Sequence, residues 1–297
     1  MKNLILFIIL QFSIVVFAQK ITKISLQKFQ VAELSDSLRE TSGLAFFNQH
    51  LLTFNDGGNP NEIYEINPKT GKILKKFKTN VPNIDWEAIT TDSNHIYIGD
   101  FGNNLGNRED LVVHQFNFSD DQNFEKSESL QESLKLPFSY QNQSDFSPKN
   151  LQHNFDTEAM IFLNGKLHIF TKEWASKATS HYILDPQKSE KQNLVSAERY
   201  QTNFVVTDAA YFNKQLFLVG YTKKAKVFLM IFDEDELGNF FSKPTKKYKL
   251  GSAFHIGQVE GIAVNQDGIY ISNEQFLKFG FHPKQRLYFI PNTEFQH

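Results

Sequence analysis

The sequence predicts an all-β fold, a β-propeller of five four-stranded blades. Three observations lead to this prediction. A unit in which an acidic or polar residue precedes a small residue and a short apolar strand occurs five times, with spacings of 45, 71, 50 and 52 residues. No window keeps a helical period over three turns, and the 30 phenylalanines favour strands. A period near 50 residues in short strands separated by turns is typical of propellers rather than of sandwiches.

The repeat is clearest in residues 85–104, DWEAITTDSNHIYIGDFGNN. Its acidic or polar position is occupied in turn by Ser42, Glu87, Glu158, Asp208 and Glu260. The small residues that follow are Gly43, Ala88, Ala159, Ala209 and Gly261. We expect each innermost strand to begin just after the acidic residue and the second strand to follow a polar turn. The long spacing after Glu87 is explained by polar insertions at 119–133 and 141–154, which we expect to be surface loops.

Ring closure is predicted at the N-terminus. The fifth unit ends after three strands, and the apolar segment 21–31 has no local pairing partner. We expect this segment to supply the outer strand of the last blade, because that removes exposed strand edges. A six-bladed ring is the alternative, but its extra blade would have to lie within residues 119–156, where the repeat does not occur.

Residues 1–18 have the features of a secretory signal peptide. Lys2 precedes an apolar run at 4–17. Val16-Phe17-Ala18 then places small residues at the two positions that a signal peptidase reads, so cleavage is expected between Ala18 and Gln19. An uncleaved membrane anchor is the alternative, although the run is shorter than the roughly 20 apolar residues that a span needs. We expect residues 19–297 to form a single domain, secreted or periplasmic, with no membrane insertion after cleavage and, without cysteine, no disulfide.

The charge balance argues against two classes of partner, nucleic acids and anionic membranes. There are 31 basic and 33 acidic residues, for a net charge of −2. No sustained positive field is present for nucleic acid or for an anionic membrane surface. The expected partners are therefore a glycan, a protein or a small molecule.

Acidic residues are expected to converge at one mouth of the propeller channel. Innermost strands begin, and second strands end, on the same face near the axis. The eight carboxylates placed there are Asp56, Glu87, Asp100, Glu158, Glu173, Asp208, Glu260 and Glu274, with Ser42 and Tyr221 in the two remaining positions. One interpretation is a site for a hard divalent cation, Ca²⁺, held by oxygen ligands. The other is that each acid accepts hydrogen bonds from the backbone of a neighbouring blade. Both remain open from the sequence.

Motifs over residues 40–175 resemble those of a family of secreted bacterial β-propellers with no assigned activity. The matching segments are Glu40-Thr41-Ser42-Gly43-Leu44, Asn55-Asp56-Gly57-Gly58, Ile63-Tyr64-Glu65-Ile66, Asp85-Trp86-Glu87-Ala88-Ile89, Gly99-Asp100-Phe101-Gly102-Asn103-Asn104 with Arg108, Asp156-Thr157-Glu158-Ala159-Met160 and Thr171-Lys172-Glu173. More distantly, the pattern is similar to SdiA-regulated, phytase-like and lactonase-like propellers. Ala88 and Asn103 stand where acidic residues are common in the family, so a metal site using those positions would be less charged here.

Six further residues are candidates for ligand binding. Asn103 and Asn104 offer neutral oxygen ligands beside the acids, and Arg108 could bind an anionic substrate or one of the nearby carboxylates. Trp86, Trp174 and Tyr221 could stack on a sugar or aromatic ligand, or pack between blades. Three functions follow: a binding or scaffold protein with Ca²⁺, a metal-dependent hydrolase of a phosphoester or lactone with Asp100 or Glu158 as base, and a structural envelope protein without metal.

Overall fold

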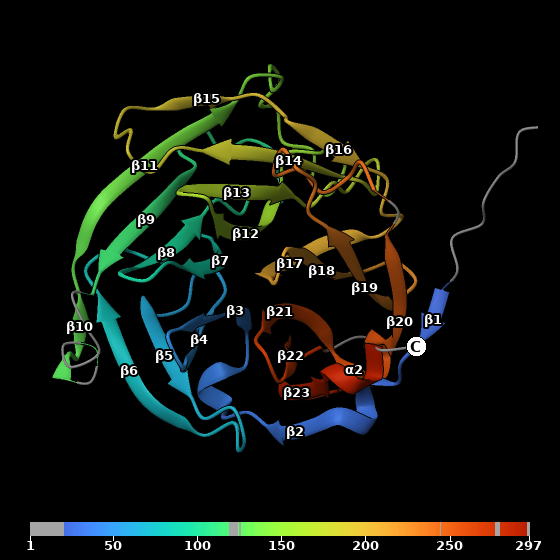
Figure 1. Ribbon diagram of the computed structural model, residues 1–297. Helices are drawn as coiled ribbons and strands as arrows, with labels where there is room; N and C mark the ends of the chain where they lie inside the picture. Colours follow the sequence, from blue (N-terminus) through green and yellow to red (C-terminus); the bar gives the residue numbers. More distant parts are fainter. Residues whose placement is uncertain (1–20, 119–123, 125, 244, 277–279, 296–297) are drawn as a thin grey trace, which may run out of the picture.

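Five β-sheets surround a central axis, each as one blade of a propeller (Figure 1). The computed structural model describes residues 21–118, 124, 126–243, 245–276 and 280–295. The expected signal peptide, residues 1–18, lies outside this part of the chain. The prediction of a five-bladed all-β propeller is confirmed. Within the described ranges, no helix has the length and apolar character that crossing a membrane requires.

The four main strands of each blade are antiparallel and follow one another from the axis outwards. Blade one contains β3 (Thr41–Phe47), β4 (His50–Asn55), β5 (Glu62–Ile66) and β6 (Ile73–Thr79). Blade two contains β7 (Trp86–Thr91), β8 (His95–Asp100), β9 (Val112–Asn117) and β11 (Glu132–Tyr140). Blade three contains β12 (Thr157–Leu163), β13 (Lys166–Thr171), β14 (Thr179–Leu184) and β16 (Glu198–Tyr200).

The remaining two blades follow the same order. Blade four contains β17 (Val205–Phe212), β18 (Gln215–Tyr221), β19 (Lys226–Asp233) and β20 (Lys246–Ser252). Blade five contains β21 (Gln258–Val264), β22 (Gly268–Glu274), β23 (Arg286–Pro291) and the N-terminal β2 (Gln30–Glu33). The described helices are single turns: η1 (Leu26–Phe29), η2 (Asp36–Leu38), α2 (Ala253–Ile256) and η3 (Asn292–Phe295).

The N-terminal segment closes the ring, but not as the single strand that the sequence suggested. The helix η1 divides it, so that β2 completes blade five while β1 (Ile21–Lys23) adds a parallel fifth strand to blade four. Two other segments add parallel outer strands in the same way. The strand β10 (Ser129–Leu130) joins blade one, and β15 (Gln192–Leu194) joins blade two. The sequence pattern missed these because short exposed strands have no distinctive apolar alternation.

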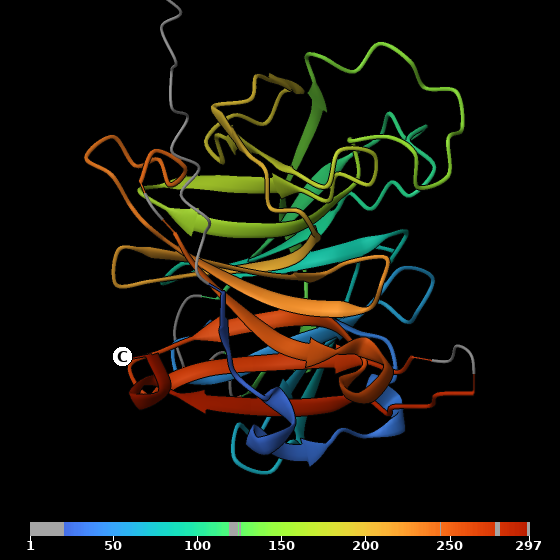
Figure 2. The ribbon, with the colours of Figure 1, turned by 90° about the vertical axis from the view of Figure 1, so that its right-hand side faces the viewer.

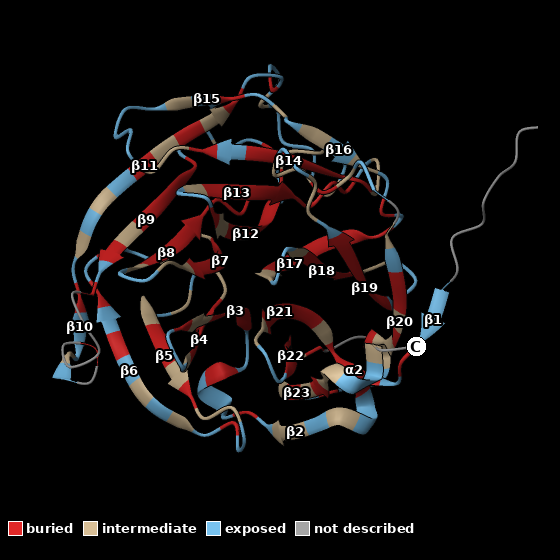
Figure 3. Cartoon of the chain, in the orientation of Figure 1, coloured by how far each residue is buried: buried red, intermediate tan, exposed pale blue. Residues whose placement is uncertain are grey.

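Burial falls from the axis to the rim. Figure 3 shows the inner strands almost wholly buried, whereas the outer strands are a mixture of exposed, half-buried and buried residues. Five apolar clusters lie between successive blades in the described chain. The cluster between blades one and two includes Phe54 and Trp86, whose ring centroids are 6.0 Å apart. It also includes Phe124, which is fully buried although residues 119–133 were expected to be a surface loop.

Replacing Leu26 with alanine is expected to lower the free energy of unfolding by about 2–5 kcal/mol. Leu26 is fully buried in the cluster between blades four and five, so its removal leaves a cavity where the chain closes the ring. Urea denaturation measures the effect. Gln27→Ala is the matched control, because Gln27 is exposed in the same turn of η1 and should change stability by no more than about 0.5 kcal/mol. Equal effects of the two substitutions would contradict this account of ring closure.

Candidate functional site: an acidic axial cavity

A β-bulge lies at the start of every inner strand. The ladder between the inner and second strands skips one residue in all five blades. In blades two, three and five the skipped residue is Glu87, Glu158 and Glu260, respectively. A bulge leaves its extra residue out of the ladder and re-aims the side chain. The repeated glutamates are therefore directed to the axis by a repeated backbone irregularity.

Asp208 occupies a different position from the three glutamates. In blade four the skipped residue is Thr207, and Asp208 is the first residue of the ladder beyond the bulge. One step along a strand turns a side chain to the opposite face. The carboxylate of Asp208 is fully buried and accepts hydrogen bonds from the backbone N–H groups of Ile262 (2.7 Å), Ala209 (2.8 Å) and Leu44 (3.3 Å). This residue ties blade four to blades five and one and does not line the cavity.

The glutamates open into a cavity of about 230 Å³ on the axis. Nine residues proposed from the sequence pattern line it: Ser42, Asp56, Glu87, Asn104, Glu158, Trp174, Tyr221, Glu260 and Glu274. Sequence reasoning missed three lining residues: Leu151, Lys172 and Gln258. Five carboxylates therefore share one small space at one end of the channel.

Lys172 is the one cationic side chain among the described residues that line this cavity. It is buried, and its ammonium group binds the carboxylate of Glu158. The same group lies 5.1 Å from the ring centroid of Trp174 and 5.6 Å from that of Tyr221. These two aromatic faces thus already have a cation beside them. Burial opposes the charge on Lys172, but Glu158, Tyr221 and Glu260 outweigh it and hold its pKa well above the usual value.

Parity along the second strand explains why Lys172 faces the axis and Glu173 does not. Thr171, Gly220 and Asn273 pair with the residues that precede the bulges, and the next residues, Lys172, Tyr221 and Glu274, line the cavity. Glu173 is one residue further and turns away. Its buried carboxylate accepts hydrogen bonds from Ser180 (2.6 Å) and Arg199 (2.7 Å). The repeat pattern therefore predicts the wrong member of this pair, because the lysine and not the acid beside it reaches the cavity.

Asp100 is also placed outside the cavity. It is one residue too early in its strand, pairs with Trp86 and is fully buried. Its carboxylate accepts hydrogen bonds from Arg108 (2.9 Å) and from the backbone N–H groups of Ile84 and Asp85 (3.3 Å each). Arg108 also donates to Asp110 at 2.9 Å. Of the two roles considered for Arg108, the geometry is that of an arginine bound to nearby acids.

The other candidate ligand residues divide between cavity and core. Asn104 is exposed at the cavity, whereas Asn103 is buried and donates to the carbonyl of Phe155 at 3.1 Å. Trp86 is fully buried in the apolar cluster between blades one and two. Trp174 lines the cavity with its Nε1–H directed to Asp156 at 2.9 Å. Core packing thus accounts for Trp86 but not for Trp174.

Three carboxylates form the tightest acidic group at this end of the channel. Asp56, Asp85 and Glu87 each offer one oxygen, and these oxygens lie within 4.8 Å of one another. Two oxygens bound to one Ca²⁺ at about 2.4 Å are at most about 4.8 Å apart, so the spacing fits a shared cation. The repeat pattern does not single out Asp85, which directly precedes β7.

Burial and mutual repulsion make these acids hard to ionise. Burial, then the charges of Asp56 and Glu158, raise the pKa of Glu87 well above its usual value. Burial and Asp56 raise the pKa of Asp85 to about 7, even though Arg108 lies 4.0 Å away. Burial also raises the pKa of Glu260 to about 7. Two carboxylates 5 Å apart repel by about 3 kcal/mol at an effective dielectric constant near 20, so a bound cation would relieve a substantial repulsion.

Two carboxylates at the cavity have oxygens without a protein partner. Glu158 is 3% exposed, and its Oε2 atom is buried with no hydrogen-bond partner in the described chain. Glu87 is 4% exposed, and no hydrogen bond joins its carboxylate to a described residue, although its oxygens are not among the fully buried atoms that lack a partner. Buried polar atoms are nearly always satisfied in folded proteins. The backbone contacts that explain Asp208 therefore do not explain Glu87 or Glu158.

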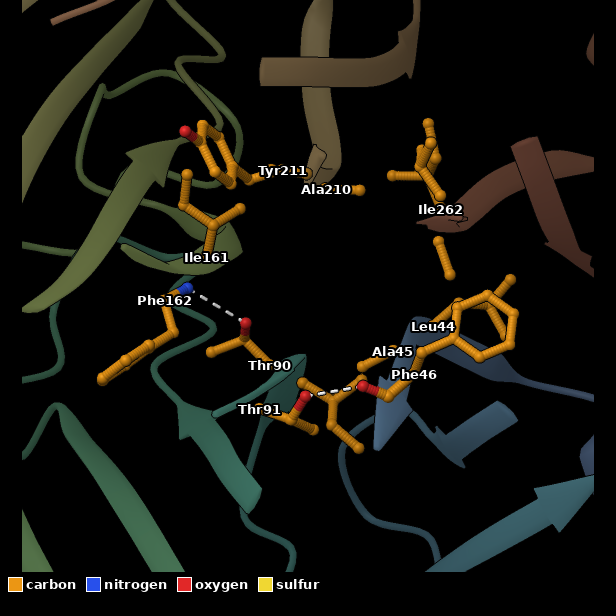
Figure 4. A pocket seen from close by; sticks show the side chains of 14 residues that line it. Leu44, Ala45, Phe46, Thr90, Thr91, Ile161, Phe162, Ala210, Tyr211 and Ile262 are labelled. Atoms are coloured by element: carbon orange, nitrogen blue, oxygen red, sulfur yellow. Dashed lines mark hydrogen bonds between the residues drawn. The ribbon is translucent and has the colours of Figure 1, made fainter. Parts of the chain in front are cut away.

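The channel has a different character at its other end. A cavity of about 120 Å³ is lined by all five inner strands, with Ala45, Ile161 and Ala210 among its largely apolar residues (Figure 4). Hydrogen bonds join neighbouring blades there. Thr91 donates to the carbonyl of Phe46 at 2.6 Å, and Thr90 accepts from the N–H of Phe162 at 3.1 Å. None of the described residues that line this second cavity on the axis is charged.

In the absence of divalent cations, the unfolding free energy is expected to fall between pH 5 and pH 8. Asp85 and Glu260 have folded pKa values of about 7, against usual values of 3.8 and 4.5, so the folded state holds more protons in this window. Their stabilising contribution is complete below the unfolded pKa values and is lost as pH rises through about 7. A difference of one between the folded and unfolded pKa corresponds to about 1.4 kcal/mol. Urea denaturation in EDTA at each pH measures the unfolding free energy. In Asp85→Asn this free energy should depend less on pH than in the wild type. A rise in stability from pH 5 to pH 8 would contradict this account.

Comparison with known proteins adds little to this geometry. No protein-family profile matches the sequence, and no curated protein matches it. Solved structures with similar folds include hydrazine synthase from Kuenenia stuttgartiensis (9% identity, TM-score 0.41, 80% of this chain and 56% of that one). A second is a hypothetical protein from Leishmania major, with 10% identity and a TM-score of 0.47 over 89% of this chain and 90% of that one. A third is a candidate oxidoreductase (glucose dehydrogenase) from Thermus thermophilus, with 12% identity and a TM-score of 0.46 over 87% of this chain and 98% of that one. The chain thus spans little more than half the length of the hydrazine synthase chain. At these levels of similarity, the function must be argued from this chain's own cavity.

Proposed function

We propose that the protein is a secreted binding propeller whose axial cavity holds Ca²⁺ through Asp56, Asp85 and Glu87. The observation that carries the proposal is the convergence of these three carboxylates within 4.8 Å. The partnerless carboxylate of Glu87 supports it, because a buried anion without hydrogen bonds requires a proton or a cation. The oxygen-only ligand set favours a hard cation. The resemblance to secreted bacterial propellers agrees with this role, since extracellular calcium modules work at dissociation constants of about 10⁻⁴–10⁻³ M.

The first experiment counts bound calcium. The protein is stripped with EDTA, equilibrated with millimolar CaCl₂ by dialysis and analysed by atomic emission. We expect about one bound Ca²⁺ per chain in the wild type and its loss in Glu87→Gln, because three converging carboxylates make one site. Glu190→Gln is the matched control, since Glu190 is exposed and does not line the axial cavity. Equal calcium in the wild type and Glu87→Gln would exclude the proposed ligand set.

A second function is favoured by the unpartnered Oε2 atom of Glu158. It is a metal-dependent hydrolase of a phosphoester or lactone. In that case, the bound cation would polarise the substrate oxygen. Glu158 would accept a proton from water, since its raised pKa brings a carboxylate closer to the range of a general base. Lys172, held beside it, would attract an anionic group. Asp100, the other candidate base, is fully engaged by Arg108 and backbone donors.

Hydrolysis of bis(p-nitrophenyl) phosphate and of an aryl-substituted lactone separates the two functions. A hydrolase should show a calcium-dependent rate that falls by at least about 100-fold in Glu158→Gln. The variant should still bind calcium through Asp56, Asp85 and Glu87. No turnover of either substrate by calcium-loaded wild type would leave the binding role as the proposal.

A further inference from the structure

The three proposed calcium ligands come from two blades, and they meet at one face of the propeller. Asp56 directly follows β4 of blade one, whereas Asp85 directly precedes β7 of blade two and Glu87 is the second residue of that strand. Figure 2 shows the connection between β11 and β12, drawn in green, projecting from one face of the propeller. Leu151 of that connection lines the axial cavity, so the acidic end of the channel belongs to this face. A shared cation there requires blade one and blade two to be held in a fixed relation.

Asp85 is held by its own blade. Its backbone N–H donates to the carboxylate of Asp100 at 3.3 Å, and its carbonyl accepts from the N–H of Gly102 at 3.1 Å. Gly102 also leaves space for the acids, because a Cβ atom at this position would come within 2.5 Å of the carboxylates of Asp85 and Glu87. Asp100 and Gly102 both belong to blade two. They therefore fix Asp85 relative to Glu87 but not relative to Asp56.

An asparagine in the connection between β6 and β7 joins the two blades at this point. Asn83 is half-buried, and its Nδ2 group donates to the carbonyls of Asn55 at 2.9 Å and Asp56 at 3.0 Å. Its Oδ1 atom accepts from the N–H of Trp86 at 3.1 Å. An asparagine amide has two hydrogens to donate, and both are directed to blade one. The oxygen is directed to the first residue of β7, next to Glu87.

We propose that Asn83 is a positioning residue of the calcium site and holds Asp56 where it can share a cation with Asp85 and Glu87. The inference rests on the proposed function. Asn83 acts through the backbone, because its amide hydrogens and its amide oxygen all bind main-chain groups. Asn59 donates to the same carbonyl of Asp56 at 2.9 Å, but it lies in the same loop and does not join that loop to blade two. Removing a residue that orients a metal ligand typically weakens metal binding by about 10–100-fold.

The first measurement is the calcium affinity of the full chain, by calorimetry after EDTA treatment. We expect Asn83→Ala to raise the dissociation constant about tenfold or more. Asn265→Ala is the matched control. Asn265 is also half-buried, and its Oδ1 atom accepts from the N–H groups of Asp267 (2.9 Å) and Gly268 (3.2 Å) in the turn between β21 and β22. This control likewise removes hydrogen bonds to the backbone, but Asn265 does not line the axial cavity, so its calcium affinity should equal that of the wild type.

The second measurement reports which ligand is lost. Terbium(III) takes oxygen ligands as calcium does, and its luminescence lifetimes in H₂O and D₂O give the number of water molecules on the bound ion. Asn83→Ala should add about one water, as Asp56→Ala should, because Asp56 leaves the ion while Asp85 and Glu87 remain. A loss of stability alone would leave this number unchanged.

A double variant tests whether Asn83 acts through Asp56. Asn83→Ala combined with Asp56→Ala should bind calcium as weakly as Asp56→Ala alone, because residues that act as a unit have non-additive effects. Asn83→Gln keeps the amide but displaces it by one methylene group. It should show the same changes to a smaller degree, and it replaces Asn83→Ala throughout if the alanine variant does not fold.

Two results would overturn the inference alone. One is calcium affinity and ion hydration in the Asn83 variant equal to those of the wild type. The other is a double variant in which the two losses of affinity add. Wild-type protein that binds no calcium would instead overturn the proposed function, and the role of Asn83 with it.

Discussion

Saturating Ca²⁺ is expected to raise the thermal unfolding midpoint of the protein by about 5–10 °C. A ligand present at 100 times its dissociation constant stabilises the folded state by about 2.7 kcal/mol, and a domain of this size converts each kcal/mol into a few degrees. The shift should be larger at pH 8 than at pH 5. Protons compete with the cation for Asp85, whose pKa is about 7, and for Glu87, whose pKa is also raised.

The Glu87→Gln variant should lose this calcium-dependent shift. Without calcium its midpoint should equal or exceed that of the wild type at pH 8, because the substitution removes a buried charge that has no hydrogen-bond partner. Differential scanning fluorimetry with CaCl₂ and with EDTA measures both effects, and Glu190→Gln serves as control. The chelated wild type must be shown to be free of metal. A calcium shift that persists in Glu87→Gln, or no shift in metal-free wild type, would count against the axial site.

Replacing Asp208 with alanine is expected to lower the unfolding free energy by about 2–4 kcal/mol. The substitution leaves three buried backbone N–H groups without an acceptor, and each unsatisfied donor costs about 1–3 kcal/mol. Part of this loss is offset, because burial raises the pKa of Asp208 well above its usual value and its charge is itself unfavourable there. Two of the lost hydrogen bonds, from Ile262 and Leu44, join blade four to blades five and one.

Two variants make the Asp208 prediction specific. Asp208→Asn keeps one acceptor oxygen and should cost less than alanine. Asp267→Ala, at an exposed turn, should change stability by no more than about 0.5 kcal/mol. Urea denaturation measures all three. Because Asp208 lies outside the cavity, folded Asp208→Asn protein should still bind calcium. A stability change below about 1 kcal/mol in Asp208→Ala would show that the blade contacts do not depend on this carboxylate.

Asp208 and Glu87 differ in their hydrogen bonds, which bears on the two interpretations of the acidic set that the sequence left open. Both stand before a small residue at the same point of the repeat. Asp208 has three backbone donors, whereas Glu87 has none among the described residues. Backbone N–H groups bind the carboxylates of Asp208 and Asp100, and Lys172 binds that of Glu158. These contacts do not account for the carboxylate of Glu87.

The repeat in the sequence determined the fold. Five units with short apolar strands and turn residues specify five blades, because each blade must bury both faces against its neighbours. The three strands of the incomplete last unit and the unpaired segment at the N-terminus predicted ring closure, and β2 provides it. The sequence also placed Glu87, Glu158 and Glu260 at one mouth, since they recur at the start of inner strands.

Only the tertiary structure decided which acids face the cavity. The side-chain period of a strand is two residues, so a bulge displaced by one position sends Asp208 to the backbone while Glu87 reaches the axis. For the same reason Lys172, and not the neighbouring Glu173, lines the cavity. The approach of Asp56 to Asp85 depends on the packing of two blades, and residues this far apart in the chain carry no local signal of contact. The repeated units in the sequence predict the fold, but long-range packing decides which face of a strand each side chain occupies.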